Sequence, residues 1–193
     1  MSGLQSQIML CLRRELSDHS KGGYLMGFPL SAIEPGDVTI REAVSEDAAI
    51  IVRFLRELAE YQDTTEYFHA TEEAILRDGF GDKREFEALI AVSEGKPVGL
   101  ATFNRTYSTW EGSVGLIIQD LFVAEEARGK QVGFHLVREV ARIAETRGAS
   151  HLQLNVVHAN PARNFYARVG FNHMDDLLTY RLSHEKMSAL LDL

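Results

Sequence analysis

The sequence has only one cysteine, Cys11, among its 193 residues, and only four prolines and one tryptophan. A single cysteine excludes an internal disulfide framework, a cysteine-based zinc cluster and a Cys–His nucleophile pair in the body of the chain. This cysteine usage is typical of proteins from a reducing compartment, so we expect a cytoplasmic protein.

Long apolar runs and excess positive charge are also missing. No apolar stretch approaches the roughly 20 residues that a membrane helix needs, and residues 8–12 are too short for the core of a secretory signal. The chain has 20 Lys and Arg against 28 Asp and Glu, a net charge of −8. We therefore expect no membrane and no nucleic-acid partner. The acidity suits a small cationic partner, or serves solubility alone.

The length suffices for one domain with a sizeable core. Apolar residues recur at helical spacing through residues 4–16, and glycines and prolines then break the pattern up to residue 37. We expect residues 1–37 to be a partly helical N-terminal extension and residues 38–193 to form the domain. The extension is either an arm that binds a partner or a second copy, or a segment peripheral to the chemistry.

From residue 38 the apolar pattern alternates between the strand and helix periods. Strands are predicted over 38–43, 85–93, 98–107, 113–123, 150–157 and 177–182. Helices are predicted from a cap at Ser45 to residue 62, from Thr71 to Gly79, from Gln131 to Arg147, in a short stretch after Pro161, and after Ser183. The helix between the strands at 116–123 and 150–157 makes a crossover connection, so these two strands should run parallel.

The stretch from residue 118 to 137 carries the strongest chemical signal. An apolar strand leads through a charged turn, with Arg128, Gly129 and Lys130, into an amphipathic helix that contains Gly133. The N–H groups and dipole of a helix N-terminus attract anions, and glycines let a ligand approach the backbone. The order of parts predicts a phosphate cradle. The alternative is that the glycines and cations only close the turn.

Two motifs on this order of elements resemble the GNAT superfamily of N-acetyltransferases over residues 38–183. Residues 128–133 match the first and last positions of the phosphate-binding signature Gln/Arg-x-x-Gly-x-Gly/Ala. Residues 161–171 match the downstream signature Pro-Ala-x-x-Phe-Tyr-x-x-x-Gly-Phe/Ala. The resemblance implies an α/β (α+β) GNAT fold, with a mixed, mostly antiparallel sheet of about six to seven strands, a central parallel pair and flanking helices. It also implies acetyl-CoA as co-substrate and no metal.

Within the superfamily the chain looks most like the diamine (spermidine/spermine) acetyltransferases, through residues 57–61, 78–81, 106–112 and 120–123. This implies acetyl transfer to a primary amine of a small, diamine- or amino-acid-like molecule, by a homodimer. Two alternatives stay open: a protein lysine or N-terminal acetyltransferase, and an acetyl-CoA-binding module with little turnover.

The resemblance also implies roles for individual residues. Tyr166 holds the position of the general acid, unless it is only an aromatic packed under the cradle helix. The residues expected to bind acetyl-CoA are Leu121, Phe122, Val123, Arg128, Gly129, Lys130, Gln131, Val132, Gly133, Phe134, Asn160, Pro161 and Arg163. The residues expected to bind the amine are Tyr61, Gln62, Gln119 and Asp120.

Four positions depart from the family pattern. Gln62 and Gln119 stand where diamine acetyltransferases carry glutamates, and a neutral amide cannot act as a base, so we predict that a polyamine is not the substrate. Gln131 replaces a cradle glycine, which is tolerable if that residue is helical. Ala159 occupies the usual asparagine position, so Asn160 would have to substitute for it.

The general base is therefore open. Asp120 is one candidate, although regular strand alternation points it away from the face of Gln119 unless a bulge intervenes. A water chain ending at Asp63, Glu111, Asp175 or Asp176 is another, and His158 is a third because histidine titrates near neutrality. His135 and His151 are expected to be structural.

Overall fold

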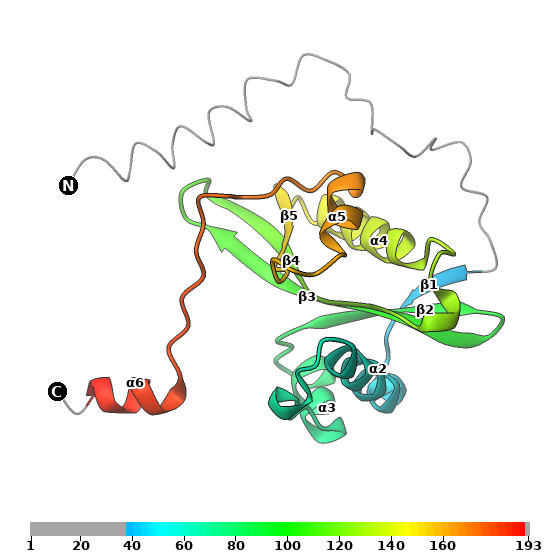
Figure 1. Cartoon of the computed structure of the whole chain (residues 1–193), viewed down its shortest axis with the longest axis horizontal. Helices are drawn as coiled ribbons and strands as arrows, with labels where there is room; N and C mark the ends of the chain where they lie inside the picture. Colours follow the sequence, from blue (N-terminus) through cyan, green and yellow to red (C-terminus); the bar gives the residue numbers. More distant parts are fainter. Residues whose placement is uncertain (1–37, 192–193) are drawn as a thin grey trace, which may run out of the picture.

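The computed structural model describes residues 38–191. They form a five-stranded sheet with helices on both faces (Figure 1). The strands are β1 (Val38–Glu42), β2 (Glu87–Ser93), β3 (Lys96–Ser108), β4 (Ser113–Val123) and β5 (His151–Leu154). The helices are α2 (Ala48–Tyr61), α3 (Glu72–Phe80), α4 (Val132–Thr146), α5 (Arg163–Val169) and α6 (His184–Leu191). The helix predicted over 4–16 lies outside the described residues.

The strand order in the sheet follows the chain, β1-β2-β3-β4-β5. The first four strands pair antiparallel, whereas β4 and β5 pair in parallel from Gly115↔His151 to Ile118↔Leu154. The crossover prediction of a parallel pair is confirmed. The pair lies at one edge of the sheet and not at its centre, because β5 is the last strand in the order.

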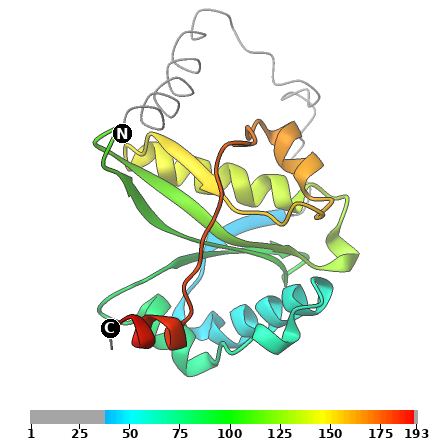
Figure 2. The same cartoon turned by 60° about the vertical axis from the view of Figure 1, so that its left-hand side comes forward.

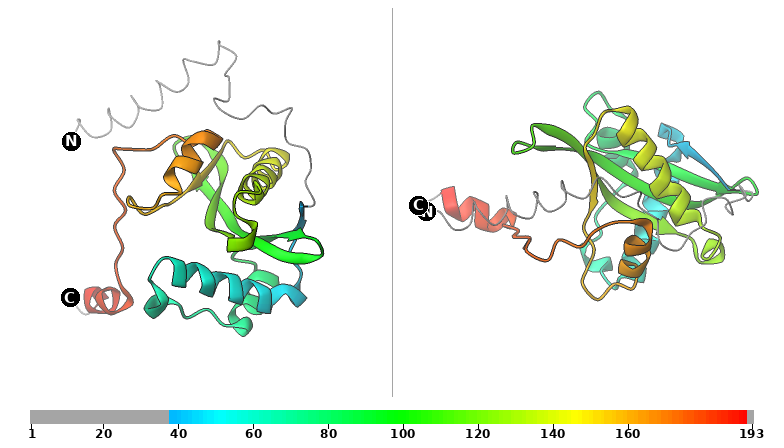
Figure 3. Two further views of the ribbon diagram at one scale, coloured as in Figure 1. Left: turned by 45° about the vertical axis from the view of Figure 1, so that its right-hand side comes forward. Right: turned by 90° about the horizontal axis from the view of Figure 1, so that it is seen from above.

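The prediction of six to seven strands is wrong for the described residues. The segment 177–182 forms no strand, and large apolar side chains along it, such as Leu178 and Tyr180, are exposed to solvent. No neighbouring strand of residues 38–191 pairs with its backbone, and an alternating pattern without a partner does not make a strand. This segment leaves the domain and carries α6 away from the sheet (Figure 3).

Two apolar cores lie on opposite faces of the sheet (Figure 2). One packs α4 against β2, β3 and β4, with Leu136 and Val140 completely buried. The other packs α2 and α3 against the opposite face, around Phe54 and Leu100. Residues 98–103 of β3 are all buried, because this central strand is covered on both faces. Among residues 38–191 no helix is long and apolar enough to cross a bilayer.

The N-terminal end of α2 is organised by Asp47 and not by Ser45 as predicted. Ser45–Asp47 form a short 3-10 turn, and the hydroxyl of Ser45 donates to Glu46 instead of capping the helix. Asp47 accepts two hydrogen bonds from Arg41, at 2.6 and 2.8 Å, and one from the backbone N–H of Val44. The predicted cap of α3 is confirmed, since Thr71 Oγ1 accepts from the N–H of Ala74.

Candidate active site

Among residues 38–191, no strand pairs with one edge of β4 at residues 119–123. Its pairing with β5 ends at Ile118, whereas its pairing with β3 continues to Val123. The carbonyl oxygen of Val123 faces this free edge and accepts from Nε of Arg128, at 3.3 Å. The side chain of Phe122 is buried against Phe54, and its carbonyl oxygen lies toward Gly99 of β3, so at the free edge the main-chain groups of Leu121 and Val123 are the ones available to a ligand. The edge presents main-chain groups that an extended, amide-containing ligand can pair with.

The predicted cradle follows directly after this edge. A 3-10 turn at Glu125–Ala127 leads to Gly129 (φ 79°) and Gln131 (φ 61°), and α4 begins at Val132. The N–H groups in the first turn of a helix have no acceptor within the helix, so they can bind an anion. A methyl group added at Gly133 would make ordinary contacts, 3.6 Å from Phe165 and 3.7 Å from Val123.

The sequence prediction tolerates Gln131 in the cradle if this residue is helical, and the structure does not meet that condition. Gln131 is the N-cap of α4, with φ 61° and ψ 13°, so it is left-handed and not part of the right-handed helix. The left-handed conformation is strained for a residue with a Cβ, so glycine is favoured at this position. The glutamine therefore carries a conformational cost that a glycine would not.

A β-bulge at Gln119 changes which side of the sheet Asp120 faces. The register between β3 and β4 runs from Phe103↔Ile118 to Thr102↔Asp120, so Gln119 is the extra residue. Thr102 lies between Ala101 and Phe103, which both belong to the core under α4. Its side chain, and that of Asp120 opposite, therefore lie on the side of α2. The bulge that the sequence left open is present, and it puts Asp120 on the same side as Gln119.

Two polar pairs connect β3 and β4 at this bulge. The hydroxyl of Thr102 donates to Oδ2 of Asp120 at 2.6 Å, and Nε2 of Gln119 donates to Oδ1 of Asn104 at 2.8 Å. Burial raises the pKa of the Asp120 carboxyl above its usual range, and the hydrogen bond from Thr102 acts in the opposite direction. A half-buried carboxyl with a raised pKa is suited to accept a proton near neutral pH.

The C-terminal end of α2 contacts the beginning of the cradle. The guanidinium carbon of Arg128 lies 4.8 Å from the centre of the Tyr61 ring, which is 56% exposed. Gln62 caps the same helix and is exposed. Within residues 38–191 no hydrogen bond joins Gln62 to Gln119 or to Asp120, so the predicted amine-binding residues are not linked into one network.

Tyr166 lies on α5, which follows the second motif. Its ring packs edge-on against Phe165 and Phe171, with centroids 5.3 and 5.9 Å apart, and burial raises the pKa of its phenol. The turn before α5 is held by Oδ1 of Asn160, which accepts from the N–H of Ala162. Arg163 donates to the carbonyl oxygen of His158. Asn160 thus supports the turn, and α5 begins two residues after Pro161.

Two of the other candidates for a base, Glu111 and Asp175, have partners of their own. Glu111 lies in the turn between β3 and β4, at the opposite end of β4 from Val123, where it accepts from Ser113. Asp175 pairs with His173 at 2.6 Å. His135 is buried, which lowers the pKa of its imidazole. No group of three His, Cys, Asp or Glu side chains within residues 38–191 is arranged to hold a metal ion.

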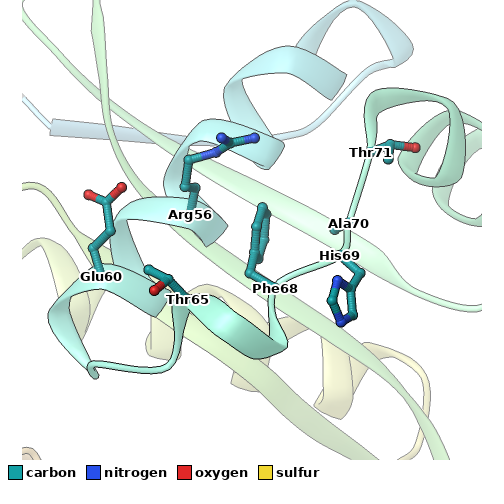
Figure 4. A pocket seen from close by; sticks show the side chains of 7 residues that line it. All are labelled: Arg56, Glu60, Thr65, Phe68, His69, Ala70 and Thr71. Atoms are coloured by element: carbon teal, nitrogen blue, oxygen red, sulfur yellow. The ribbon is translucent and has the colours of Figure 1, made fainter.

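A pocket of about 390 Å³ lies elsewhere, between α2 and the segment that leads to α3 (Figure 4). The guanidinium of Arg56 lies over the Phe68 ring there, at 5.4 Å. The lining residues are Arg56, Glu60, Thr65, Phe68, His69, Ala70 and Thr71. The residues predicted from the sequence do not converge in this pocket.

Sequence reasoning missed Thr102 and Asn104. Both lie on β3 opposite the bulge, and their partners depend on a register shift that strand periodicity does not reveal. The signal available was Thr102 itself, a polar residue within the apolar run at 98–103 that had to find a hydrogen-bond partner once buried.

Comparisons with known proteins agree with this geometry. The family model Acetyltransferase (GNAT) family matches residues 51–171. Thialysine N-epsilon-acetyltransferase from Bos taurus is 35% identical over 142 residues, which cover 69% of this chain and 83% of the relative. The protein of the same name from Sus scrofa is 35% identical over 165 residues, covering 79% and 96%. Spermidine/spermine N(1)-acetyltransferase-like protein 1 from Homo sapiens is 31% identical over 162 residues, covering 80% of this chain and 23% of that protein.

Solved structures share the fold. An integron cassette protein from the mobile metagenome of V. cholerae superposes with a TM-score of 0.69 at 25% identity, covering 81% of this chain and 99% of that one. An aminoglycoside acetyltransferase from an uncultured soil metagenomic sample superposes with a TM-score of 0.65 at 14% identity, covering 76% and 96%, which is a likeness of fold. The free edge of β4, the cradle at the start of α4 and the family match over residues 51–171 lead to one conclusion: this chain belongs to the GNAT family of acetyl-CoA-dependent N-acetyltransferases.

Proposed function

We propose that the chain transfers the acetyl group of acetyl-CoA to the side-chain amine of a small, amino-acid-like acceptor, with Asp120 as the proton acceptor. The observation that carries this proposal is the bulge at Gln119, which puts the carboxyl of Asp120 on the α2 side of β4, next to the free edge. The bulge thus places a carboxylate on the side of the sheet where Gln119 offers only a neutral amide.

The proposed reaction joins the amine nitrogen to the thioester carbon and breaks the carbon–sulfur bond. An alkylammonium has a pKa of about 10.4, so it must lose a proton before it can attack, and Asp120 takes this proton directly or through water. Main-chain N–H groups at the free edge of β4 stabilise the oxyanion that forms. In the binding of acetyl-CoA, the free edge holds the pantetheine and the start of α4 holds the pyrophosphate.

The leaving thiolate takes a proton from Tyr166. Because burial raises the pKa of this phenol above 10, it keeps its proton in the resting enzyme. Donation to a thiolate whose thiol has a pKa near 8.5 is uphill by at least about 2 kcal/mol, so it accompanies departure of the thiolate. Tyr166 thus acts on the sulfur, and Asp120 acts on the nitrogen.

The acceptor is inferred from the charges around the site. A polyamine carries several cations, and Gln62 and Gln119 offer them neutral amides. An amino acid with one side-chain amine does not need these additional carboxylates. The relatives named for thialysine, at 35% identity, support the same class of acceptor.

A thiol-release assay with acetyl-CoA tests the acceptor class on a panel of thialysine, lysine analogues, polyamines and peptides. We expect turnover on thialysine and lysine analogues with kcat/KM at least about tenfold above that on spermidine, which corresponds to about 1.4 kcal/mol. Gln119→Glu should lower this ratio of kcat/KM values, because it raises kcat/KM on spermidine. Gln119→Asn keeps a neutral amide and should leave the ratio unchanged. Faster turnover on spermidine would contradict the inference from Gln62 and Gln119. Turnover on peptides alone would indicate a protein acetyltransferase, and acetyl-CoA binding without turnover would indicate a binding module.

We also propose a homodimer. The segment 172–191 exposes large apolar side chains outside the domain: Met174, Leu177, Leu178, Tyr180, Leu182, Met187, Leu190 and Leu191. Many exposed apolar side chains along one segment favour a protein partner, and a second copy of the chain is the partner that the subfamily resemblance implies. Light scattering should give twice the chain mass of 21.6 kDa. Leu178→Glu should shift the measured mass toward that of the monomer. A wild-type protein with the mass of a monomer would contradict the proposal.

A further inference from the structure

We propose that Thr102 is a positioning residue for the transfer, because its hydroxyl orients the carboxyl of Asp120, which the bulge places on the α2 side of β4. This inference rests on the proposed role of Asp120 as the proton acceptor. It adds a residue from β3, a strand that contributes no other residue to the predicted site.

Burial fixes the position of the Thr102 hydroxyl beside Asp120. Thr102 is 3% exposed, within the run of β3 that is covered on both faces. A buried hydroxyl needs a partner, and Oδ2 of Asp120 at 2.6 Å is the partner it has. Because Thr102 is β-branched and enclosed, its side chain has few alternative rotamers. The position of the carboxyl is therefore set by a rigid group on the central strand.

The contact engages only one of the two carboxyl oxygens. Oδ2 accepts from Thr102, whereas Oδ1 accepts no hydrogen bond from the residues that the structure describes. A carboxylate can accept several hydrogen bonds, so the second oxygen remains available to an ammonium group or a bridging water. One oxygen is held in place and the other is left for the acceptor.

The same contact affects the charge of Asp120. Burial favours the neutral acid and raises the pKa, while donation from Thr102 favours the carboxylate and lowers it. Within residues 38–191 no cation forms an ion pair with Asp120, so the hydroxyl is the contact that opposes burial. Loss of the hydroxyl should leave a carboxyl that is less well oriented and protonated over a wider pH range.

The test compares Thr102→Val, which removes the hydroxyl and keeps the shape, with Thr102→Ser, which keeps the hydroxyl. The pKa of Asp120 is measured by a carbon-13 NMR titration of its carboxyl in the intact chain, and kcat is measured against pH. Thr102→Val should raise the pKa of Asp120, move the acid limb of kcat to higher pH and lower kcat about tenfold. The KM for acetyl-CoA should stay within about twofold. Thr102→Ser should return both the pKa and kcat close to the wild-type values.

A purely structural role predicts a different result. Thr102→Val would then lower the thermal midpoint while the pKa of Asp120 and the acid limb stayed in place, and this would overturn the proposal. Thr102→Ala serves as a second variant without a hydroxyl if the valine variant does not fold. The NMR titration does not depend on turnover. If the wild type acetylates no amine, the proposed function fails, while the titration still decides whether Thr102 controls Asp120.

Discussion

The guanidinium carbon of Arg128 lies 4.8 Å from the centre of the Tyr61 ring, while Nε of the same arginine donates to the carbonyl oxygen of Val123. One side chain thus connects the end of α2, the free edge of β4 and the turn that leads into α4. The residue expected to bind the pyrophosphate is held by a residue expected to bind the amine. This contact couples the two halves of the proposed site.

Replacing Tyr61 by leucine should weaken the binding of acetyl-CoA two- to fivefold. The change removes the aromatic face that holds Arg128, and an exposed cation–π contact is worth about 0.5–1 kcal/mol. Tyr61→Phe keeps the face and should bind as the wild type does. Calorimetric titration with acetyl-CoA measures the difference. Equal affinities for the leucine and phenylalanine variants would show that the contact does not position Arg128.

Replacing Tyr166 by phenylalanine should lower kcat about 100-fold, because the variant has no proton to give to the leaving thiolate. The affinity for acetyl-CoA should stay within about twofold, since the packing against Phe165 and Phe171 is retained. Single-turnover thiol release, run beside calorimetry, separates the two quantities. An unchanged kcat would favour the alternative reading of Tyr166 as a packing residue.

Replacing Gln131 by glycine should raise the free energy of unfolding by about 1 kcal/mol. Gln131 has φ 61°, a left-handed conformation that costs a residue with a Cβ about 1–2 kcal/mol, and the greater freedom of glycine in the unfolded chain offsets part of the gain. Gln131→Ala retains the strain, so its stability should stay close to that of the wild type. Urea unfolding followed by circular dichroism provides the measurement. Equal stability of the glycine and alanine variants would contradict the account.

These residues indicate how much the sequence could predict. The strand, turn and helix of residues 113–146 could be predicted, because apolar periodicity and turn glycines are local features that short segments specify. The side of the sheet on which Asp120 lies could not be predicted. It depends on a one-residue shift in register between β3 and β4 that only the packing of both cores selects. The residue that organises the start of α2 could not be predicted for a similar reason. Asp47 is selected over Ser45 by Arg41, which reaches it from β1.

The pair of Arg41 and Asp47 should make stability depend on pH. Hydrogen bonds from Arg41 hold the pKa of the Asp47 carboxyl below its usual range. The stabilisation is therefore complete above the unfolded-state pKa of about 3.9 and is lost as the pH falls through the lower folded value. Asp47→Asn should cost about 1–2 kcal/mol at pH 7, a figure kept low because the Arg41 side chain is 43% exposed.

The cost of Asp47→Asn should shrink as the pH falls below about 4, where the wild type also loses the charge. Urea unfolding of both proteins at several pH values measures this difference. Ser45→Ala serves as the comparison and should have little effect at any pH, because Ser45 does not cap α2. A cost of Asp47→Asn that stayed the same at pH 7 and pH 3 would show that the ion pair does not contribute.

Calorimetric titration of acetyl-CoA into the wild type, Gly133→Asp and Gly133→Ala tests the central claim most directly. An acidic residue in the first turn of α4 is favourable to the helix dipole but repels a pyrophosphate, so Gly133→Asp should keep its thermal midpoint and lose at least tenfold in affinity. The methyl group of Gly133→Ala meets only ordinary contacts, so this variant should bind within about threefold of the wild type. Wild-type affinity in the aspartate variant would contradict the assignment of the start of α4 as the site that holds acetyl-CoA.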